Sequence, residues 1–124
     1  DLFLVSARLK KTRILCGDFS LALEETEPGM FVYLDPPYYP LSETARFTSY
    51  VADSFGEEEQ RRLARAFQNL DQKGCRVMLS NSDTPFIREL YRGYNLVEVK
   101  ARRAINCKAE GRRPITELVI RNYQ

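Results

Sequence analysis

Short apolar runs alternate with amphipathic segments along this chain. Each run has the length and the β-branched or aromatic content of a strand that is buried on both faces. The runs occupy residues 12–16, 30–34, 75–79, 96–100 and 116–120. Because such strands alternate with helices, the pattern predicts an α/β sheet with helices flanking it.

The clearest helix is predicted to begin at Ser54 and to end before Gly74. Ser54 and Glu57 fit a capping box, and Gly74 suits the left-handed conformation that often ends a helix. An apolar stripe predicts its buried face, formed by Leu63, Phe67 and Leu70. Two acid-first pairs at i, i+4 predict a solvated face with no assigned function: Glu57 with Arg61, and Glu58 with Arg62.

Shorter helices and two long loops complete the predicted organisation. The shorter helices span residues 2–9, 20–25 and 85–93. Thr84 and Pro85 have the residue types of an N-cap and a first helical position, and Gly93 ends that helix. Residues 39–53 and 101–114 show no regular pattern and are predicted loops; long loops of this kind are usually functional.

Length and composition indicate a single domain, spanning residues 1–124, with 44% hydrophobic residues to form its core. The three cysteines are odd in number and lack C-x-x-C spacing, which predicts a reducing, cytoplasmic compartment. The sequence has no histidine, which excludes histidine-based catalysis, and we expect no metal site. No apolar run has the length of a membrane span, so we expect no membrane partner.

The most informative segment is Asp35-Pro36-Pro37-Tyr38, which follows the apolar run at residues 30–34. Prolines cannot continue the hydrogen bonds of a sheet, so Asp35 is predicted at the end of that strand and Tyr38 just beyond it. Open α/β sheets bind ligands at the carboxyl ends of their strands. The segment therefore places a carboxylate and an aromatic ring where chemistry occurs; the alternative is that Asp35 only starts a tight turn.

These residue types favour an amino group on a flat ring as the bound group. An ionised Asp35 and the carbonyls of Pro36 and Pro37 accept hydrogen bonds and donate none. The ring of Tyr38 offers a face for stacking. An aminated nucleobase fits both features, and within a duplex it must be flipped out to be reached.

Four segments of the chain occur in the order of one family's motifs. Residues 35–50 begin with D-P-P-Y, and residues 79–83 read L-S-N-S-D. Residues 99–105 read V-K-A-R-R-A-I, and residues 117–118 are Glu-Leu. This ordered set, within residues 12–120, resembles the Dam-type, D-P-P-Y family of adenine-specific DNA methyltransferases.

The resemblance implies a partial Rossmann-like methyltransferase sheet in a cytoplasmic enzyme of bacteria or phages, in some cases with a restriction–modification partner. It implies methyl transfer from S-adenosylmethionine to the exocyclic amino group of a flipped adenine in double-stranded DNA. It assigns catalysis to Asp35, Pro36, Pro37 and Tyr38. Asp35 and Tyr38 would also contact the cofactor, together with Asp18 and Phe19; the alternative is that Asp18 only caps the following helix.

Two polar stretches and one further residue are predicted to contact DNA. Residues 100–113 contain six basic side chains and one acid, which suits phosphate contact. We assign Arg102, Arg103, Arg112 and Arg113 from that stretch, and Arg46, Thr44 and Tyr50 from the long loop before it. Asn81 is assigned within the L-S-N-S-D segment. The alternative for residues 100–113 is an ordinary solvated basic loop.

Two motifs of the family have no counterpart in this sequence: the glycine-rich F-x-G-x-G loop and the acid that holds the cofactor ribose. We therefore expect the chain to be the C-terminal part of a catalytic domain, inactive by itself. Strand 30–34 would then have open edges, which predicts self-association. The alternatives are a non-catalytic DNA-binding remnant, or an amino methyltransferase that acts on cytosine, RNA or protein glutamine.

Overall fold

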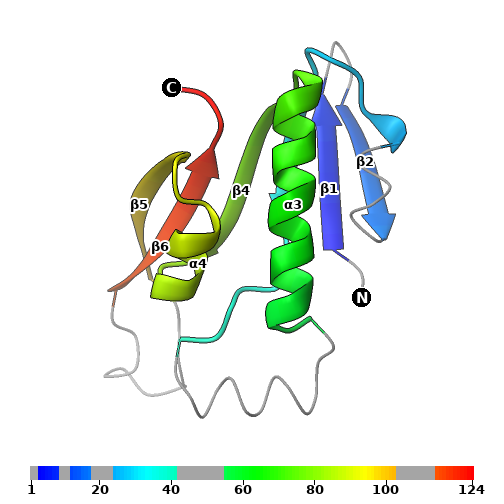
Figure 1. Cartoon of the computed structure of the whole chain (residues 1–124). Helices are drawn as coiled ribbons and strands as arrows, with labels where there is room; N and C mark the ends of the chain where they lie inside the picture. Colours follow the sequence, from blue (N-terminus) through cyan, green and yellow to red (C-terminus); the bar gives the residue numbers. More distant parts are fainter. Residues whose placement is uncertain (1–2, 9–11, 18–23, 42–54, 103–113) are drawn as a thin grey trace.

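The computed structural model of the chain describes residues 3–8, 12–17, 24–41, 55–102 and 114–124. Residues 3–8, 12–17, 101–102 and 114 are described by their backbone alone. Within these residues, six strands form one sheet in the order β2-β1-β3-β4-β6-β5 (Figure 1). Their bounds are β1 (Phe3–Arg8), β2 (Thr12–Gly17), β3 (Phe31–Asp35), β4 (Arg76–Ser82), β5 (Asn95–Arg102) and β6 (Pro114–Arg121).

The directions of the strands put four carboxyl ends at one edge of the sheet. β3 and β4 are parallel neighbours, and the other four neighbouring pairs are antiparallel. It follows that β2, β3, β4 and β5 all run the same way. The predicted α/β class is confirmed as a mixed sheet with helices packed on it.

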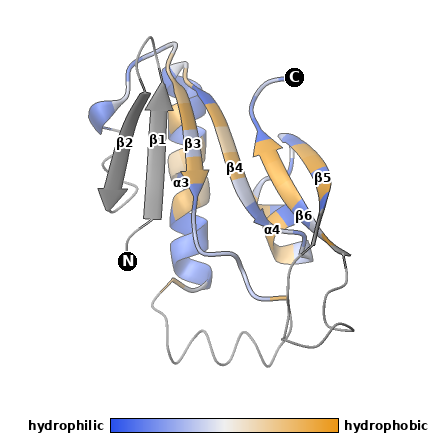
Figure 2. Ribbon diagram, turned by 180° about the vertical axis from the view of Figure 1, so that it is seen from behind, coloured by the Kyte–Doolittle hydropathy of each residue, from blue (hydrophilic) through white to orange (hydrophobic). Residues whose placement is uncertain are grey.

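Two helices, α3 (Glu57–Lys73) and α4 (Pro85–Leu90), lie on the same face of this sheet (Figures 1 and 2). The predicted stripe on α3 is confirmed, because Leu63, Phe67 and Leu70 are fully buried. They pack in one core with inward residues of the strands: Val32, Leu34, Val77, Leu79, Leu118 and Ile120. Burying one such side chain contributes roughly 2 kcal/mol, so this core fixes which face of α3 meets the sheet. No helix in the described residues has the length and apolar character needed to cross a membrane.

Residues 3–8 form a strand, so the helix predicted over residues 2–9 is wrong. β1 pairs antiparallel with β2 on one side and with β3 on the other. A helix at this place would leave the backbone groups along one edge of β3 unpaired, and a helix this short is marginal by itself. Phe3 and Val5 are residue types that strands favour, so their local preference agrees with the pairing.

The same pairing closes the edge that was expected to be open. β3 lies between β1 and β4, and one strand, β1, separates it from β2. Self-association through an unpaired β3 is therefore not available to this structure. Self-association by another route stays a prediction.

The start of α3 differs from the predicted capping box. The helix begins at Glu57, with Gly56 as its N-cap and no hydrogen bond from a capping side chain; Ser54 lies outside the described residues. The first turn instead carries three glutamates at residues 57–59, which the positive end of the helix dipole favours. At the other end, Gly74 takes the predicted left-handed conformation, with φ of +101°.

The ion pairs on α3 are partly as predicted. Glu57 contacts Arg61 at 3.5 Å, which confirms the first pair. Arg62 contacts Glu59 at 2.7 Å rather than Glu58, and Glu58 contacts Arg61 at 3.8 Å. The spacing i, i+3 brings side chains as close as i, i+4, so the sequence alone does not choose between them.

Several boundaries of the other elements shift by a few residues. β4 continues to Ser82, and α4 ends at Leu90 rather than at Gly93. Gly93 lies in the turn before β5 and has a φ of +99°. Of the helix predicted at residues 20–25, Glu24 and Glu25 are helical and the rest lies outside the described residues.

The two predicted loops are described only at their ends. Residues 39–41 are irregular, as predicted, and residues 42–53 lie outside the described part of the chain. Residues 101–102 and 114 belong to β5 and β6, so the loop predicted at 101–114 is shorter than expected. Its remainder also lies outside the described residues.

Candidate active site

Asp35 is the last residue of β3, and it is exposed. Its predicted place at the end of a strand is confirmed. Pro36, which follows, is buried and leaves the sheet. The parallel neighbour β4 ends at the same edge with Ser82. The structure therefore presents an acid where open sheets bind their ligands.

The next two residues are held by side chains from α3 and β6. The carbonyl of Pro37 accepts a hydrogen bond from Gln60 Nε2 at 3.0 Å. Tyr38 is half-buried, and its hydroxyl donates to Glu117 Oε1 at 3.3 Å. The backbone of the segment is thus tied to a helix, and its aromatic ring to a strand.

Two buried amide side chains link α3, β4 and the segment after β3. Gln60 is 1% exposed and Asn81 is 0% exposed. Asn81 Nδ2 donates to Gln60 Oε1 at 3.1 Å. Asn81 Oδ1 accepts from the backbone N–H of Tyr39 at 2.9 Å and of Ser82 at 2.8 Å. Both polar atoms of each amide therefore have partners inside the protein.

This burial is inconsistent with the DNA contact that we predicted for Asn81. Its side chain is inaccessible to solvent, and its hydrogen bonds go to Tyr39, Ser82 and Gln60. The assignment came from the place of Asn81 in the L-S-N-S-D segment, which does not specify the direction of its side chain. Because side chains alternate between the faces of a strand, Asn81 instead points into the protein.

Tyr39 provides a further anchor for the same segment. It is 7% exposed, and its hydroxyl donates to Glu57 Oε2 at 2.8 Å. Its ring packs against Phe86 of α4, with the centroids 4.5 Å apart. Glu57 was predicted on a solvated face without function, but it joins the first turn of α3 to the segment that follows Asp35.

A pocket of about 190 Å³ opens beside the ring of Tyr38. Its lining comes from the segment after β3, the end of β4 and the start of β6: Tyr38, Tyr39, Pro40, Leu41, Ser82, Ile115, Thr116 and Glu117. Tyr38 therefore forms a wall of an open space at the carboxyl edge. Within the described part of the chain, no group of three or more acidic or cysteine side chains is placed to hold a metal ion.

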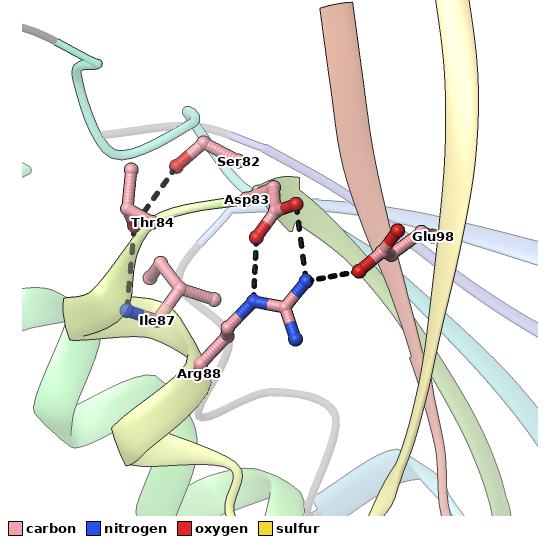
Figure 3. A network of polar contacts seen from close by, with 6 residues as sticks. All are labelled: Ser82, Asp83, Thr84, Ile87, Arg88 and Glu98. Atoms are coloured by element: carbon pink, nitrogen blue, oxygen red, sulfur yellow. Dashed lines mark hydrogen bonds and ion pairs between the residues drawn. The ribbon is translucent and has the colours of Figure 1, made fainter.

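Asp83 and Thr84 organise the turn from β4 into α4 (Figure 3). Thr84 Oγ1 accepts from the backbone N–H of Ile87 at 3.4 Å, which confirms the predicted N-cap. The Asp83 carboxylate accepts from Arg88 at 2.6 and 3.1 Å, and Arg88 also donates to Glu98 of β5 at 2.6 Å. Hydrogen bonds to Asp83, and then to Glu98, raise the pKa of the Arg88 guanidinium. This network holds the turn beside the end of β4.

Asp18 and Phe19 lie outside the described residues, but the strand before them is placed. β2 ends at the same edge of the sheet as β3. Cys16 and Asp35 are both register partners of Leu4 in β1. Their backbones are therefore two strand spacings apart, roughly 10 Å.

Most residues predicted to contact DNA lie outside the described part of the chain: Thr44, Arg46, Tyr50, Arg103, Arg112 and Arg113. Arg102 is the last residue of β5, and its register partner Pro114 begins β6. Because β5 runs in the same direction as β4 and β3, this junction lies at the edge that carries Asp35.

Sequence reasoning did not assign Gln60, Tyr39 or Glu117 to the site. Gln60 lies three residues before Leu63 and seven before Phe67, so it falls on the apolar stripe of α3. A polar residue on a buried stripe was the available signal. Glu117 reaches Tyr38 through the pairing of β4 with β6, which the sequence does not specify.

Comparisons with known proteins agree with this arrangement. Residues 1–105 match the family model described as D12 class N6 adenine-specific DNA methyltransferase. The type II methyltransferase M1.LlaDCHI of Lactococcus lactis subsp. cremoris is 48% identical over 111 residues, which are 90% of this chain and 39% of that protein. The type II methyltransferase M.MjaIII of Methanocaldococcus jannaschii is 47% identical over 121 residues, 96% of this chain and 42% of that protein.

A more distant relative gives the same picture. The DNA adenine methylase of Escherichia coli (strain K12) is 34% identical over 119 residues, which are 96% of this chain and 43% of that protein. The chain thus spans about two fifths of the length of these relatives. The family model covers most of the chain, and the chain belongs to the D12 class N6 adenine-specific DNA methyltransferases.

Proposed function

We propose that this chain is the C-terminal part of the catalytic domain of a longer enzyme. That enzyme transfers a methyl group from S-adenosylmethionine to the exocyclic amino group of adenine in double-stranded DNA. The observation that carries the proposal is the exposed Asp35 at the carboxyl end of β3, followed by a segment that Gln60 and Asn81 anchor. Membership in the adenine-specific family supports the same reaction.

The order of elements supports a Rossmann-like methyltransferase sheet, of which this chain supplies a part. β3, α3 and β4 form a β-α-β unit, in which a helix connects two parallel neighbours. The carboxyl ends of β2, β3, β4 and β5 meet at one edge, as ligand binding in such sheets requires.

Asp35 and Pro36 would act on the amino group of the target base. The amino lone pair is conjugated into the adenine ring, so it is a poor nucleophile. Hydrogen bonds to the Asp35 carboxylate and the Pro36 carbonyl would favour tetrahedral nitrogen and stabilise the positive charge that develops there. We assign Pro36 to this contact, and the Pro37 carbonyl accepts from Gln60. No covalent enzyme intermediate is needed.

Tyr38 would stack on the flipped base and align it. Tyr38 lines the open pocket at the sheet edge, and its hydroxyl donates to Glu117. Stacking on a fixed ring would keep the amino nitrogen in line with the incoming methyl group, which is an orientation effect.

The residues at this edge fit a positively charged nucleoside as the methyl donor. Asp35 offers an exposed carboxylate, and roughly 10 Å separates the ends of β2 and β3. Asp18, Phe19, Asp35 and Tyr38 would hold the donor. S-adenosylmethionine supplies an activated methyl group on its sulfonium when it is bound.

Phosphate contacts would come from the basic residues at the end of β5 and beyond it. The junction of β5 and β6 lies at the edge that carries Asp35, which supports this role for Arg102, Arg103, Arg112 and Arg113. Arg46, Thr44 and Tyr50 would contact DNA from the segment that follows Tyr38. Such contacts position a duplex without reading its sequence.

The test is methyl transfer by the full-length enzyme that carries this segment. The enzyme is incubated with tritium-labelled S-adenosylmethionine and a short DNA duplex, and the product nucleosides are separated. We expect the label in N6-methyladenine. Label in cytosine, in a matched RNA or in protein would select one of the alternative substrates, and no transfer would favour a non-catalytic DNA-binding role.

A further inference from the structure

Resting on the proposed function, we infer that Gln60 and Asn81 are positioning residues for methyl transfer. Together they hold the backbone on both sides of Tyr38. Gln60 donates to the carbonyl of Pro37, the residue before Tyr38, at 3.0 Å. Asn81 accepts from the N–H of Tyr39, the residue after it, at 2.9 Å. The bond of 3.1 Å between the two amides makes them one connected unit.

The composition of the segment explains why side chains must supply these bonds. Pro36, Pro37 and Pro40 have no backbone N–H, so within residues 36–40 only Tyr38 and Tyr39 carry one. A segment with so few donors cannot be fixed by a regular ladder of backbone hydrogen bonds. Asn81 uses one of the two donors, and Gln60 fixes a carbonyl at the other side of Tyr38.

The chemistry of the amide group suits this task. Each amide donates and accepts hydrogen bonds at the same time and carries no charge. An ionised carboxylate cannot donate, and at 0–1% exposure its burial would cost much free energy. A pair of apolar residues would fill the same space, but it would leave the Pro37 carbonyl and the Tyr39 N–H without these hydrogen bonds. What an apolar pair would lose is the hold on Pro37 and Tyr39.

The supports of the two amides are rigid elements. Gln60 lies on the buried stripe of α3, and Asn81 lies in β4 at the centre of the sheet. A displacement of about 1 Å at a reacting group can cost on the order of 100-fold in rate. Loss of this unit would therefore lower the rate of methyl transfer while the binding surfaces for cofactor and DNA remain.

The first experiment compares Gln60→Met with Gln68→Met in the full-length enzyme. Methionine keeps the length of Gln60 and removes both of its hydrogen bonds; Gln68 is exposed on the same helix and serves as the control. We expect Gln60→Met to lower the single-turnover methylation rate by about 10- to 100-fold, with dissociation constants for cofactor and DNA within about threefold. A rate equal to that of Gln68→Met would overturn the inference.

Asn81→Leu provides a second test, and this single variant does not depend on the folding of Gln60→Met. Leucine has about the size of Asn81 and removes both the acceptor for Tyr39 and Ser82 and the donor to Gln60. We expect a loss of rate, and we expect the double variant with Gln60→Met to be no slower than the slower single variant. Losses that multiply would show that the two residues act separately and would overturn the connected unit.

Hydrogen exchange of the Tyr39 amide separates this inference from the proposed function. In the chain of residues 1–124 the amide should be protected, and Gln60→Met should increase its exchange rate more than Gln68→Met does. Unchanged exchange would contradict the positioning role, whatever the reaction. Faster exchange together with a full-length enzyme that transfers no methyl group would support positioning of Tyr38 and reject the proposed function.

Discussion

The hydroxyl of Tyr38 donates to the carboxylate of Glu117 at 3.3 Å, and this bond joins the segment after β3 to β6 across the carboxyl edge of the sheet. The hydrogen bond involves the tip of the side chain, whereas the proposed stacking involves its ring. The two contributions of Tyr38 can therefore be separated by substitution.

Tyr38→Phe should lower methyl transfer by only about two- to tenfold, because one hydrogen bond is lost. Tyr38→Ala should lower kcat/KM by about 10- to 100-fold, because stacking of a base on an aromatic ring is worth roughly 1–3 kcal/mol. Glu117→Gln keeps an acceptor for the hydroxyl and serves as the control. Steady-state kinetics with a short duplex measures all three, and a Phe variant as damaged as the Ala variant would reject the stacking role.

Asp35→Ala in the full-length enzyme should abolish most methyl transfer and leave cofactor binding largely intact, because Asp18, Phe19 and Tyr38 would still hold the donor. The proposed acceptor role of Asp35 belongs to the transition state, and losing one well-placed electrostatic partner typically costs about 100- to 1,000-fold in rate. Tritium transfer gives the rate, and calorimetry with S-adenosylmethionine gives the affinity. Near-normal turnover would remove Asp35 from the reaction.

Replacing Arg102, Arg103, Arg112 and Arg113 by Gln should weaken DNA binding without changing sequence preference. Phosphate contacts carry no base code, and each one contributes roughly one unit to the slope of log affinity against log salt. We expect the quadruple variant to lose up to about four units of slope on cognate and unrelated duplexes alike. An unchanged slope would show that these residues do not touch the phosphate backbone.

The placement of Asp35 could be predicted because its causes are local. An apolar run of strand length is followed by Asp35 and two prolines, and the strand must end there because proline has no N–H for the hydrogen bonds of a sheet. The buried stripe of α3 and the left-handed conformation of Gly74 could be predicted for the same reason, because each is determined by residues close to it in the sequence.

The partners that hold the site could not be predicted, because they are set by pairing between distant segments. Residues 3–8 pair as a strand with both β2 and β3, and the sequence does not specify the pairing with β3. The hydrogen bond of Asn81 to Gln60 could not be read from the sequence, because the sequence does not show whether a polar residue at a strand end points outward or toward a buried glutamine. Glu117 depends in the same way on the register of β6 against β4.

Tyr91 and Tyr94 should respond to substitution by phenylalanine with opposite signs. The hydroxyl of Tyr91 is buried without a hydrogen-bond partner among the described residues, whereas that of Tyr94 donates to Asp71 Oδ2 at 3.1 Å. We expect Tyr91→Phe to raise the free energy of unfolding by about 1 kcal/mol and Tyr94→Phe to lower it by about 1 kcal/mol. Urea unfolding of the chain measures both, and a destabilised Tyr91→Phe would reveal a partner for that hydroxyl.

The same two tyrosines should limit the stability of the chain at alkaline pH. Burial raises the pKa of Tyr91, and burial, followed by the bond to Asp71, raises the pKa of Tyr94 from 10.0 to about 12. Above pH 10 the unfolded chain loses phenolic protons that the folded chain retains. The stabilisation that comes from Tyr94 is therefore complete below pH 10 and is lost as the pH rises through about 12. Urea midpoints measured between about pH 8 and pH 11 should therefore fall, and they should fall less steeply in the double variant Tyr91→Phe, Tyr94→Phe. Equal slopes for the two proteins would mean that other groups control alkaline unfolding.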